Sequence, residues 1–288
     1  MKANRRLQAS RMKPRTPEPE RYTVREGQVS DIGVFPFGLP ILPVAQKHLK
    51  PKRVFVLGVY ASAVHARWVG PDGKPVIAAI GVASEPEIFW RGDGVESILS
   101  RVSVPREVGR LELASEKLNG PSGVALDERF LAPLGLSRGD AWLCNLVPHS
   151  CMNPRQKVAI QDRYMPYVRK SMLPNHTWKP VPQQLATKSR RSEIVAEVLK
   201  SKATVIITLG DQPLRWFTRH FGSKGRLATY GTGTADYGRL HPIEIRGREI
   251  SLLPLVHPRQ AAGLGTHSSV WLDVHELWAK KTARNLLH

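Results

Sequence analysis

Five apolar runs, separated by longer polar or helix-like stretches, constrain the fold of this chain more than any other feature. They cover residues 53–60, 76–82, 141–147, 204–210 and 249–257. Short apolar runs bounded by breakers are typical of strands buried on both faces, and buried strands that alternate with helices form mostly parallel sheets. The spacing therefore predicts an α/β fold.

Residues 192–201 and 211–221 are expected to form helices on either side of the fourth run, with Ser192 and Asp211 as N-caps, and residues 270–287 a closing helix. Residues 166–182 are expected to form a long, basic, irregular connection.

Together these elements predict one domain over residues 31–288, a three-layer α/β/α sandwich with a central, mostly parallel sheet of about four strands. Residues 1–30 have little apolar periodicity and are expected to form a flexible basic arm, either solvated or touching DNA.

The charge of the chain favours a polyanionic partner. Its 288 residues include 43 Lys and Arg against 24 Asp and Glu, a formal net charge of +19. Such an excess favours nucleic acid, because neutralised phosphates release their counterions. We find no apolar run long enough to span a membrane and no secretory signal, and two cysteines cannot build a disulfide framework. We expect a cytoplasmic, monomeric DNA-binding protein with no membrane partner.

The last apolar run ends abruptly at His257, Pro258 and Arg259. Open α/β sheets bind their ligands just beyond the carboxyl ends of the strands, so His257 is a candidate functional residue. A structural histidine at a strand end is the alternative.

Several common sites are excluded. The stretch 70–74 lacks the spacing and hydroxyl of a phosphate-binding loop, and no nucleophile elbow is present. Cys144, His149 and Cys151 match no common zinc spacing, and two cysteines cannot hold an iron–sulfur cluster. We therefore expect no metal and no cofactor.

Segments at the strand ends, taken in order, resemble those of the uracil-DNA glycosylase superfamily. They are residues 54–58 with the following loop, 89–93, 143–148, 205–212 and 257–258. The resemblance implies that His257 hydrogen-bonds O2 of the departing base and that Asn145 reads the edge of a flipped base. A turn-forming Asn is the alternative for Asn145.

The first loop departs from the best-known members of that superfamily, because Gly58 is followed by Val59 and Tyr60 where they have an Asp or Asn two places after the glycine. Some glycosylases carry a later Gly-Asp instead, which Asp93 resembles. Asp93 is thus the expected water-orienting carboxylate, with a plain turn residue as the alternative and His65 and Glu96 in reserve.

The base-binding residues implied by the resemblance include Tyr60, Ser62 and an aromatic that stacks on the base, Phe89 or Trp90, with core packing as the alternative for both. Ser62 stands where the uracil-specific family has a tyrosine against C5 of the base. A small residue there leaves space for thymine or a bulkier C5-modified pyrimidine.

DNA contacts are expected from the loop after His257. Its wedge or phosphate candidates are Arg259, Gln260 and Leu264. A track of cations could extend this surface, and surface cations that are merely solvated are the alternative. The track comprises Arg155, Lys157, Arg190 and Arg191.

The sequence thus predicts a monofunctional DNA glycosylase that leaves an abasic site. Its substrate would be uracil or a damaged pyrimidine, in base excision repair, or a bulky modified cytosine of phage DNA such as glucosylated hydroxymethylcytosine, in antiviral defence. A catalytically inactive DNA-binding relative is the main alternative. A metal-dependent nuclease comes third, because no compact carboxylate cluster is visible.

Overall fold

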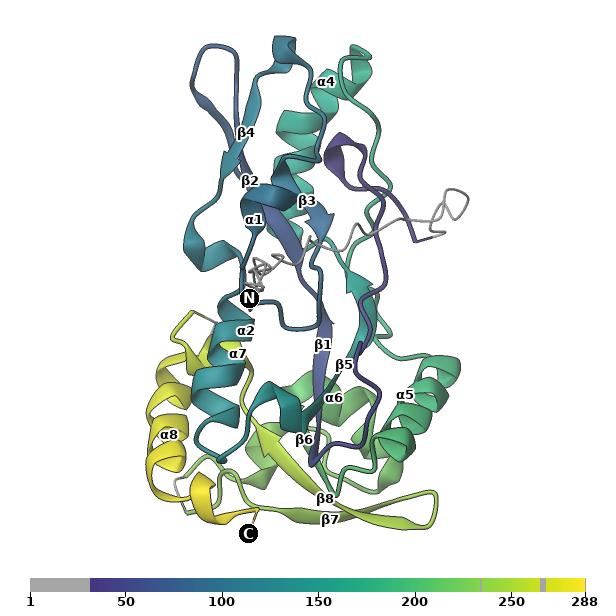
Figure 1. Cartoon of the computed structure of the whole chain (residues 1–288), viewed down its shortest axis with the longest axis vertical. Helices are drawn as coiled ribbons and strands as arrows, with labels where there is room; N and C mark the ends of the chain where they lie inside the picture. The colour runs from purple at the N-terminus through teal and green to yellow at the C-terminus, as the bar shows by residue number, and fades with distance from the viewer. Residues whose placement is uncertain (1–31, 234, 265–267, 288) are drawn as a thin grey trace, which may run out of the picture.

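The computed structural model describes residues 32–233, 235–264 and 268–287. The predicted arm over residues 1–30 lies outside the described residues. Figure 1 shows an elongated molecule with a large sheet and most of the long helices at one end, and a smaller sheet at the other.

The larger sheet has five strands in the order β5-β1-β6-β8-β7. Its strands are β1 (Val54–Ala61), β5 (Ala141–Ser150), β6 (Val205–Leu209), β7 (His241–Ile245) and β8 (Arg248–Leu255). The neighbours β5, β1, β6 and β8 pair in parallel, and β7 runs antiparallel to β8 at one edge. The sheet is therefore mixed and mostly parallel.

Four of the five apolar runs lie in this sheet as predicted. All residues of β6 are buried, and β1 and β5 are buried over most of their length. This burial explains why the strands show continuous apolar character instead of alternation. The fifth run, residues 76–82, also forms a strand, but in the other sheet.

The smaller sheet is antiparallel, with the order β3-β2-β4. Its strands are β2 (Ala63–Val69), β3 (Pro75–Ser84) and β4 (Arg110–Leu113). A single residue, Ser62, separates β1 from β2, so one stretch of backbone serves both sheets.

This sheet has an aromatic core of its own, in which Phe37 packs edge-on against Trp68 and Tyr164, with ring centroids 5.4 Å and 5.2 Å apart. The prediction of a single four-stranded sandwich missed this second sheet and core.

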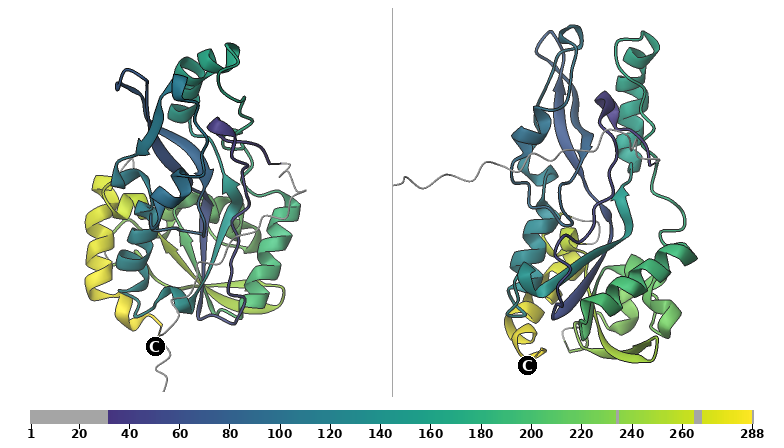
Figure 2. Two further views of the ribbon diagram at one scale, coloured as in Figure 1. Left: turned by 45° about the horizontal axis from the view of Figure 1, so that its top comes forward. Right: turned by 45° about the vertical axis from the view of Figure 1, so that its right-hand side comes forward.

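Helices surround the larger sheet, with α5 and α6 against its strands and α2, α7 and α8 packed together on the opposite side (Figures 1 and 2). The helices are α1 (Val95–Leu99), α2 (Pro121–Ala125), α3 (Pro154–Ala159), α4 (Met165–Arg169), α5 (Lys188–Ser201), α6 (Asp211–Trp216), α7 (Pro258–Ala261) and α8 (Ser268–Lys281). Two π-helical segments, Leu126–Leu131 and Ile160–Tyr164, continue α2 and α3.

The helix starts differ from the predicted ones. The N-cap of α5 is Thr187, whose side chain accepts the N–H of Arg190, so Ser192 lies inside the helix. Gly210 occupies the N-cap position of α6, and the Asp211 carboxylate instead accepts the N–H of Leu227 at 2.7 Å. In both cases the cap lies N-terminal to the predicted residue.

The connectivity places a topological switch point between β1 and β6 at the carboxyl edge of the larger sheet. From β1 the next strand of this sheet, β5, lies on one side, and from β6 the chain continues to β7 and β8 on the other. Ligands of open α/β sheets bind where neighbouring strands diverge in this way. Because β6 pairs with β1 only from Val54 to Leu57, the chain from Gly58 onward extends beyond that pairing.

Candidate active site

Gly58 allows two predicted site residues to meet at the carboxyl edge. It pairs in register with Asn145 of β5. A methyl group at Gly58 would lie 2.6 Å from Cζ of Phe89 and would overlap Oδ1 of Asn145. The Asn145 amide and the Phe89 ring therefore occupy the space that a side chain on β1 would fill.

Asn145 presents an unused hydrogen-bonding group. Its side chain is buried, with 3% of the residue exposed, and Oδ1 has no hydrogen-bond partner among the described residues. Leaving a buried carbonyl oxygen unpaired costs about 1–3 kcal/mol. Such an oxygen is available to accept a hydrogen bond from a ligand.

Phe89 has an unusual backbone conformation, with φ of 53°. A left-handed conformation costs a bulky residue roughly 1–2 kcal/mol and tends to occur at functional sites. The Arg138 guanidinium donates to the Phe89 carbonyl oxygen at 2.5 Å and stabilises this turn. Both predicted stacking residues are buried: the Phe89 ring lies beside Asn145 within the core of the larger sheet, and Trp90 lies beside Val64 and Ala83 in a small core cluster. Core packing therefore describes both residues in this structure, and only Phe89 also adjoins Asn145.

His257 lies at the N-cap of α7, next to Gly210, the residue that follows β6. Its Nδ1 accepts the backbone N–H of Arg259 at 3.2 Å. Burial, with a smaller contribution from the Arg259 charge, lowers the pKa of His257 to about 4. The ring is therefore neutral at pH 7 with its proton on Nε2, where it can donate a hydrogen bond to a ligand.

The Arg259 guanidinium lies within electrostatic reach of several site residues. Its charge contributes to lowering the pKa values of His257 and His65, and it opposes the effect of burial, which raises the pKa of Tyr60. His65 has a pKa of about 4, mainly because it is buried, and its Nδ1 has no partner in the described part of the chain. Arg259 thus links the β1–β2 segment to the loop after β8.

Glu85 is a buried carboxyl that sequence reasoning missed. It follows β3 and is 5% exposed. Burial raises its pKa to about 8, against the effect of hydrogen bonds from the backbone at Ser62 and Trp90. It therefore ties the exposed Ser62 to the turn that carries Phe89. Its neighbours Pro86 and Glu87 gave this segment the sequence character of a solvated loop.

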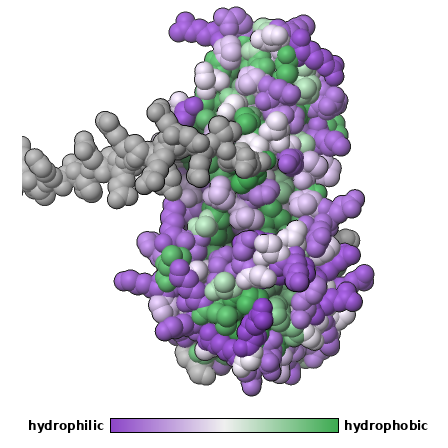
Figure 3. All heavy atoms as spheres, turned by 90° about the vertical axis from the view of Figure 1, so that its right-hand side faces the viewer, coloured by the Kyte–Doolittle hydropathy of each residue, from purple (hydrophilic) through white to green (hydrophobic). Residues whose placement is uncertain are grey.

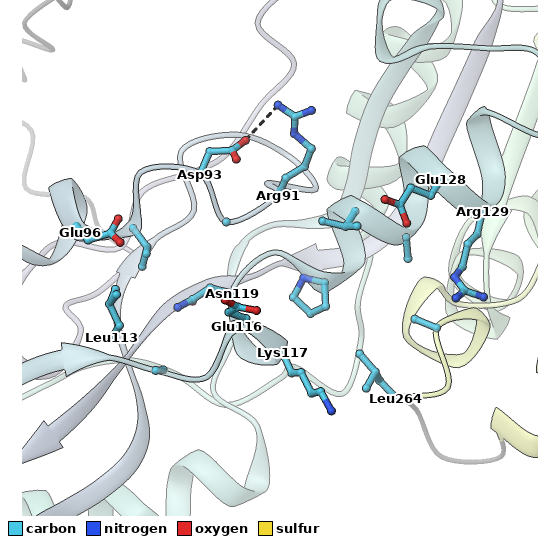
Figure 4. Close-up of a pocket in the computed structure, with 17 residues that line it drawn as sticks. Arg91, Asp93, Glu96, Leu113, Glu116, Lys117, Asn119, Glu128, Arg129 and Leu264 are labelled. Atoms are coloured by element: carbon cyan, nitrogen blue, oxygen red, sulfur yellow. Dashed lines mark ion pairs between the residues drawn. The ribbon is translucent and has the colours of Figure 1, made fainter.

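Asp93 lies apart from this group. Its side chain is 72% exposed and forms an ion pair with Arg91 at 3.1 Å. It lines an open pocket of about 590 Å³ that also includes Glu96, Lys117 and Leu264, and neither His257 nor Asn145 lines that pocket (Figure 4). The Arg259 charge thus acts on His257, Tyr60 and His65, whereas Asp93 and Leu264 line a pocket that includes none of these four residues.

The predicted cation track divides into two kinds of residue. Arg155 and Lys157 are exposed on α3. Arg190 is half-buried on α5 and donates to the carbonyl oxygens of Asn145 at 2.8 Å and Leu146 at 3.1 Å. Arg191 donates to the Ala186 carbonyl oxygen at 2.8 Å. The placement of Arg190 and Arg191 on a phosphate-binding track is therefore corrected, because both side chains hold local backbone.

Among the described residues, no group of three or more His, Cys, Asp or Glu side chains is arranged to hold a metal ion. No helix within that part of the chain is long and apolar enough to cross a membrane. Comparison with protein-family models gives no match, and comparison with curated proteins gives no significant match.

Proposed function

We propose that this protein is a monofunctional DNA glycosylase with an α/β/α core of the uracil-DNA glycosylase type. One observation carries the proposal: a buried amide with an unpaired oxygen, a strained aromatic and a neutral histidine lie at the carboxyl edge of one parallel sheet. These residues are Asn145, Phe89 and His257. They supply the edge recognition, the stacking surface and the leaving-group contact that removal of a flipped base requires.

In this mechanism the Phe89 ring and the Asn145 amide move apart to contact the flipped base, because in this structure both are buried and share the space above Gly58. Cleavage of the glycosidic bond leaves negative charge on the departing pyrimidine and positive charge on the sugar. The Nε2–H of His257 donates to O2 of the base and stabilises its anion. A neutral ring can take this role because its Nε2–H is a hydrogen-bond donor and no free energy is needed to protonate a buried imidazole whose pKa is about 4.

Two carboxyls compete for the role of orienting water. Asp93 is accessible but paired with Arg91, whereas Glu85 is buried next to Ser62. With its pKa of about 8, Glu85 would act as a base only as the pH rises through 8. If Glu85 activates water, the rate of base release should increase with pH around that value.

DNA is the partner that the charge favours. The chain carries a formal charge of +19, and hydrophilic residues cover most of the face shown in Figure 3. The exposed cations Arg155 and Lys157, together with Arg259 at the site, would contact phosphates. The logarithm of the DNA-binding constant should fall linearly with the logarithm of the salt concentration.

The substrate is proposed as uracil or a damaged pyrimidine, or a pyrimidine with a bulky group at C5. The small, exposed Ser62 between β1 and β2 supports the second class, because it would leave space beside the base. A role in repair follows from the first class and a role in defence against phage from the second.

The deciding experiment measures base release from duplexes that contain uracil, G·T or G·U mismatches, hydroxymethylcytosine or its glucosylated form, with alkali cleavage of abasic sites. We expect alkali-labile product on at least one duplex, and its loss in His257→Ala and Asn145→Ala. Asp93→Asn and Glu85→Gln, run in parallel, identify the water-activating carboxyl.

The separation of Asp93 from His257 favours one alternative, a DNA-binding protein without catalysis. That alternative predicts salt-dependent binding to the same duplexes and no abasic product on any of them. Binding without product would overturn the glycosylase proposal.

A further inference from the structure

A chain of buried hydrogen bonds leads from the residue before His257 to helix α8 and then to the π-helical segment. The N–H of Val256 donates to the Tyr237 hydroxyl at 3.0 Å. The same hydroxyl lies 2.7 Å from Nδ1 of His275, and Nε2 of His275 lies 2.9 Å from the carbonyl oxygen of Arg129. Tyr237 and His275 are 2% and 1% exposed.

The donor and the acceptor in each of these hydrogen bonds follow from the two backbone groups at the ends of the series. A backbone N–H can only donate and a backbone carbonyl can only accept. The Tyr237 hydroxyl therefore accepts from Val256 and donates to Nδ1 of His275, and Nε2 of His275 carries the proton that it donates to Arg129. Burial lowers the pKa of His275 to about 4, which keeps the neutral ring that this arrangement needs.

Arg129 also holds the other end of the same loop. Its Nη1 donates to the carbonyl oxygen of Ala261, the last residue of α7, at 2.9 Å. Glu276 of α8 accepts from the same Nη1 at 3.4 Å. The segment that carries His257 and Arg259 is thus held at both ends by one connected set of bonds.

We propose that Tyr237, His275 and Arg129 are positioning residues that fix the location and orientation of the His257 ring. This inference rests on the proposed function, in which His257 contacts the departing base. A ring that donates one hydrogen bond to a developing anion must be held to within a fraction of an ångström, and a four-residue helix cannot supply that rigidity alone.

The contribution of the hydroxyl can be separated from that of the ring. The Tyr237 ring packs against Trp271 and Trp278, with centroids 5.9 Å and 6.2 Å away. Tyr237→Phe keeps this packing and removes only the bonds to Val256 and His275. Tyr230→Phe is a matched control, because Tyr230 is also buried and its hydroxyl bonds instead to the backbone of Lys224, accepting its N–H at 2.8 Å and donating to its carbonyl oxygen at 3.3 Å.

The first readout is the titration of His257 followed by NMR in the full-length protein without DNA. We expect Tyr237→Phe to raise the pKa of His257 by about one unit toward its usual value, because the loosened loop admits water. Tyr230→Phe should leave that pKa unchanged. An unchanged His257 titration in Tyr237→Phe would overturn the proposal, and this readout does not depend on the protein being an enzyme.

The second readout is the single-turnover rate of base release on whichever duplex the wild type cleaves. We expect Tyr237→Phe and His275→Leu each to lower the rate about tenfold or more, because each removes two buried hydrogen bonds, with DNA affinity within twofold of wild type. His275→Gln should recover part of the rate, because an amide can both accept and donate. A normal rate in Tyr237→Phe, with His257→Ala inactive, would contradict positioning and leave the glycosylase proposal standing.

Discussion

Gly58 matters because of the side chain that it lacks. Asn145 and Phe89 come from distant parts of the chain and share the space above this residue. The glycine needs no special backbone angle here, since its φ is outside the left-handed region. Its role is to let two side chains approach the backbone of β1.

We expect Gly58→Ala to lower the free energy of unfolding by about 1–3 kcal/mol, because the added methyl group overpacks a buried strand. It should also displace Asn145 or Phe89 and so reduce base release. Urea denaturation measures the first effect and the abasic-site assay the second.

Gly233→Ala is the control for this substitution, because a methyl group there would have no atom of the described residues within 4 Å. If the Gly58→Ala protein is as stable and as active as the Gly233→Ala protein, Asn145 and Phe89 do not fill the space above Gly58 and the prediction is wrong.

At this scale the sequence located some site residues and not others. His257 could be placed because it ends an apolar run, so the carboxyl edge of the sheet was its expected location. Asn145 was expected near the end of its strand, but β5 continues to Ser150, so Asn145 lies within the strand and pairs with Gly58 of β1. The exposure of Asp93 and the burial of Glu85 could not be foreseen. Both depend on how loops pack between two sheets, and neighbouring residues carry no signal of that packing.

At the scale of elements, Arg190 attaches helix α5 to β5, the strand that carries Asn145. Arg190 donates to two consecutive carbonyl oxygens of β5, at Asn145 and Leu146, and forms an ion pair with Glu193 at 2.9 Å. These carbonyls lie in the middle of β5. Arg190 thus fixes the strand segment that presents the Asn145 amide.

Arg190→Met should lower the free energy of unfolding by about 1–3 kcal/mol, because it leaves backbone carbonyls of β5 without their charged donor. It should also reduce base release more than DNA affinity. The measurements are urea denaturation and fluorescence anisotropy with labelled DNA.

Arg155→Met provides the contrast, because Arg155 is exposed on α3. It should leave stability unchanged within about 0.5 kcal/mol and reduce the salt dependence of DNA binding. Equal stabilities of the two variants would show that Arg190 is only a surface charge.

Local pattern predicted four of the five strands of the larger sheet, because burial on both faces produces continuous apolar runs. It missed the edge strand β7, in which the exposed Glu244 lies between the buried Ile243 and Ile245. It could not assign residues 76–82 to a different sheet, since an apolar run does not specify its partner strand. It also missed β2, in which Arg67 and the half-buried His65 interrupt the apolar pattern. Which strands pair with each other depends on the packing of the whole chain.

For the whole molecule, the buried histidines and the buried Glu85 make the free energy of unfolding depend on pH in opposite directions. His65, His257 and His275 have pKa values of about 4 when folded and 6.5 ordinarily, so the unfolded chain binds more protons between these values. Stability therefore rises with pH over that range. Glu85, at about 8 instead of 4.5, binds an extra proton when folded, so its contribution falls as pH rises from 4.5 to 8.

We therefore expect a maximum in the free energy of unfolding near pH 6.5, where the contribution of the histidines is nearly complete and the loss from Glu85 continues. Between pH 6.5 and 8 the contribution of Glu85 should fall by up to about 2 kcal/mol, and the remaining gain from the three histidines, about 1 kcal/mol, offsets part of this fall. Urea denaturation at pH 5, 6.5 and 8 tests this curve. Glu85→Gln should remove the fall above pH 6.5 and keep the loss at pH 5; an unchanged alkaline fall would refute the assignment to Glu85.

The two separate cores allow parts of the chain to fold at different times during translation. The aromatic residues of the smaller core all precede residue 179, whereas the larger core includes Leu253 and Trp278 near the end of the chain. A ribosome releases the N-terminal part first, so the smaller core can close while the last strand is still being translated. Phe89 and Asn145 emerge before His257, and the nascent protein thus acquires its leaving-group residue last.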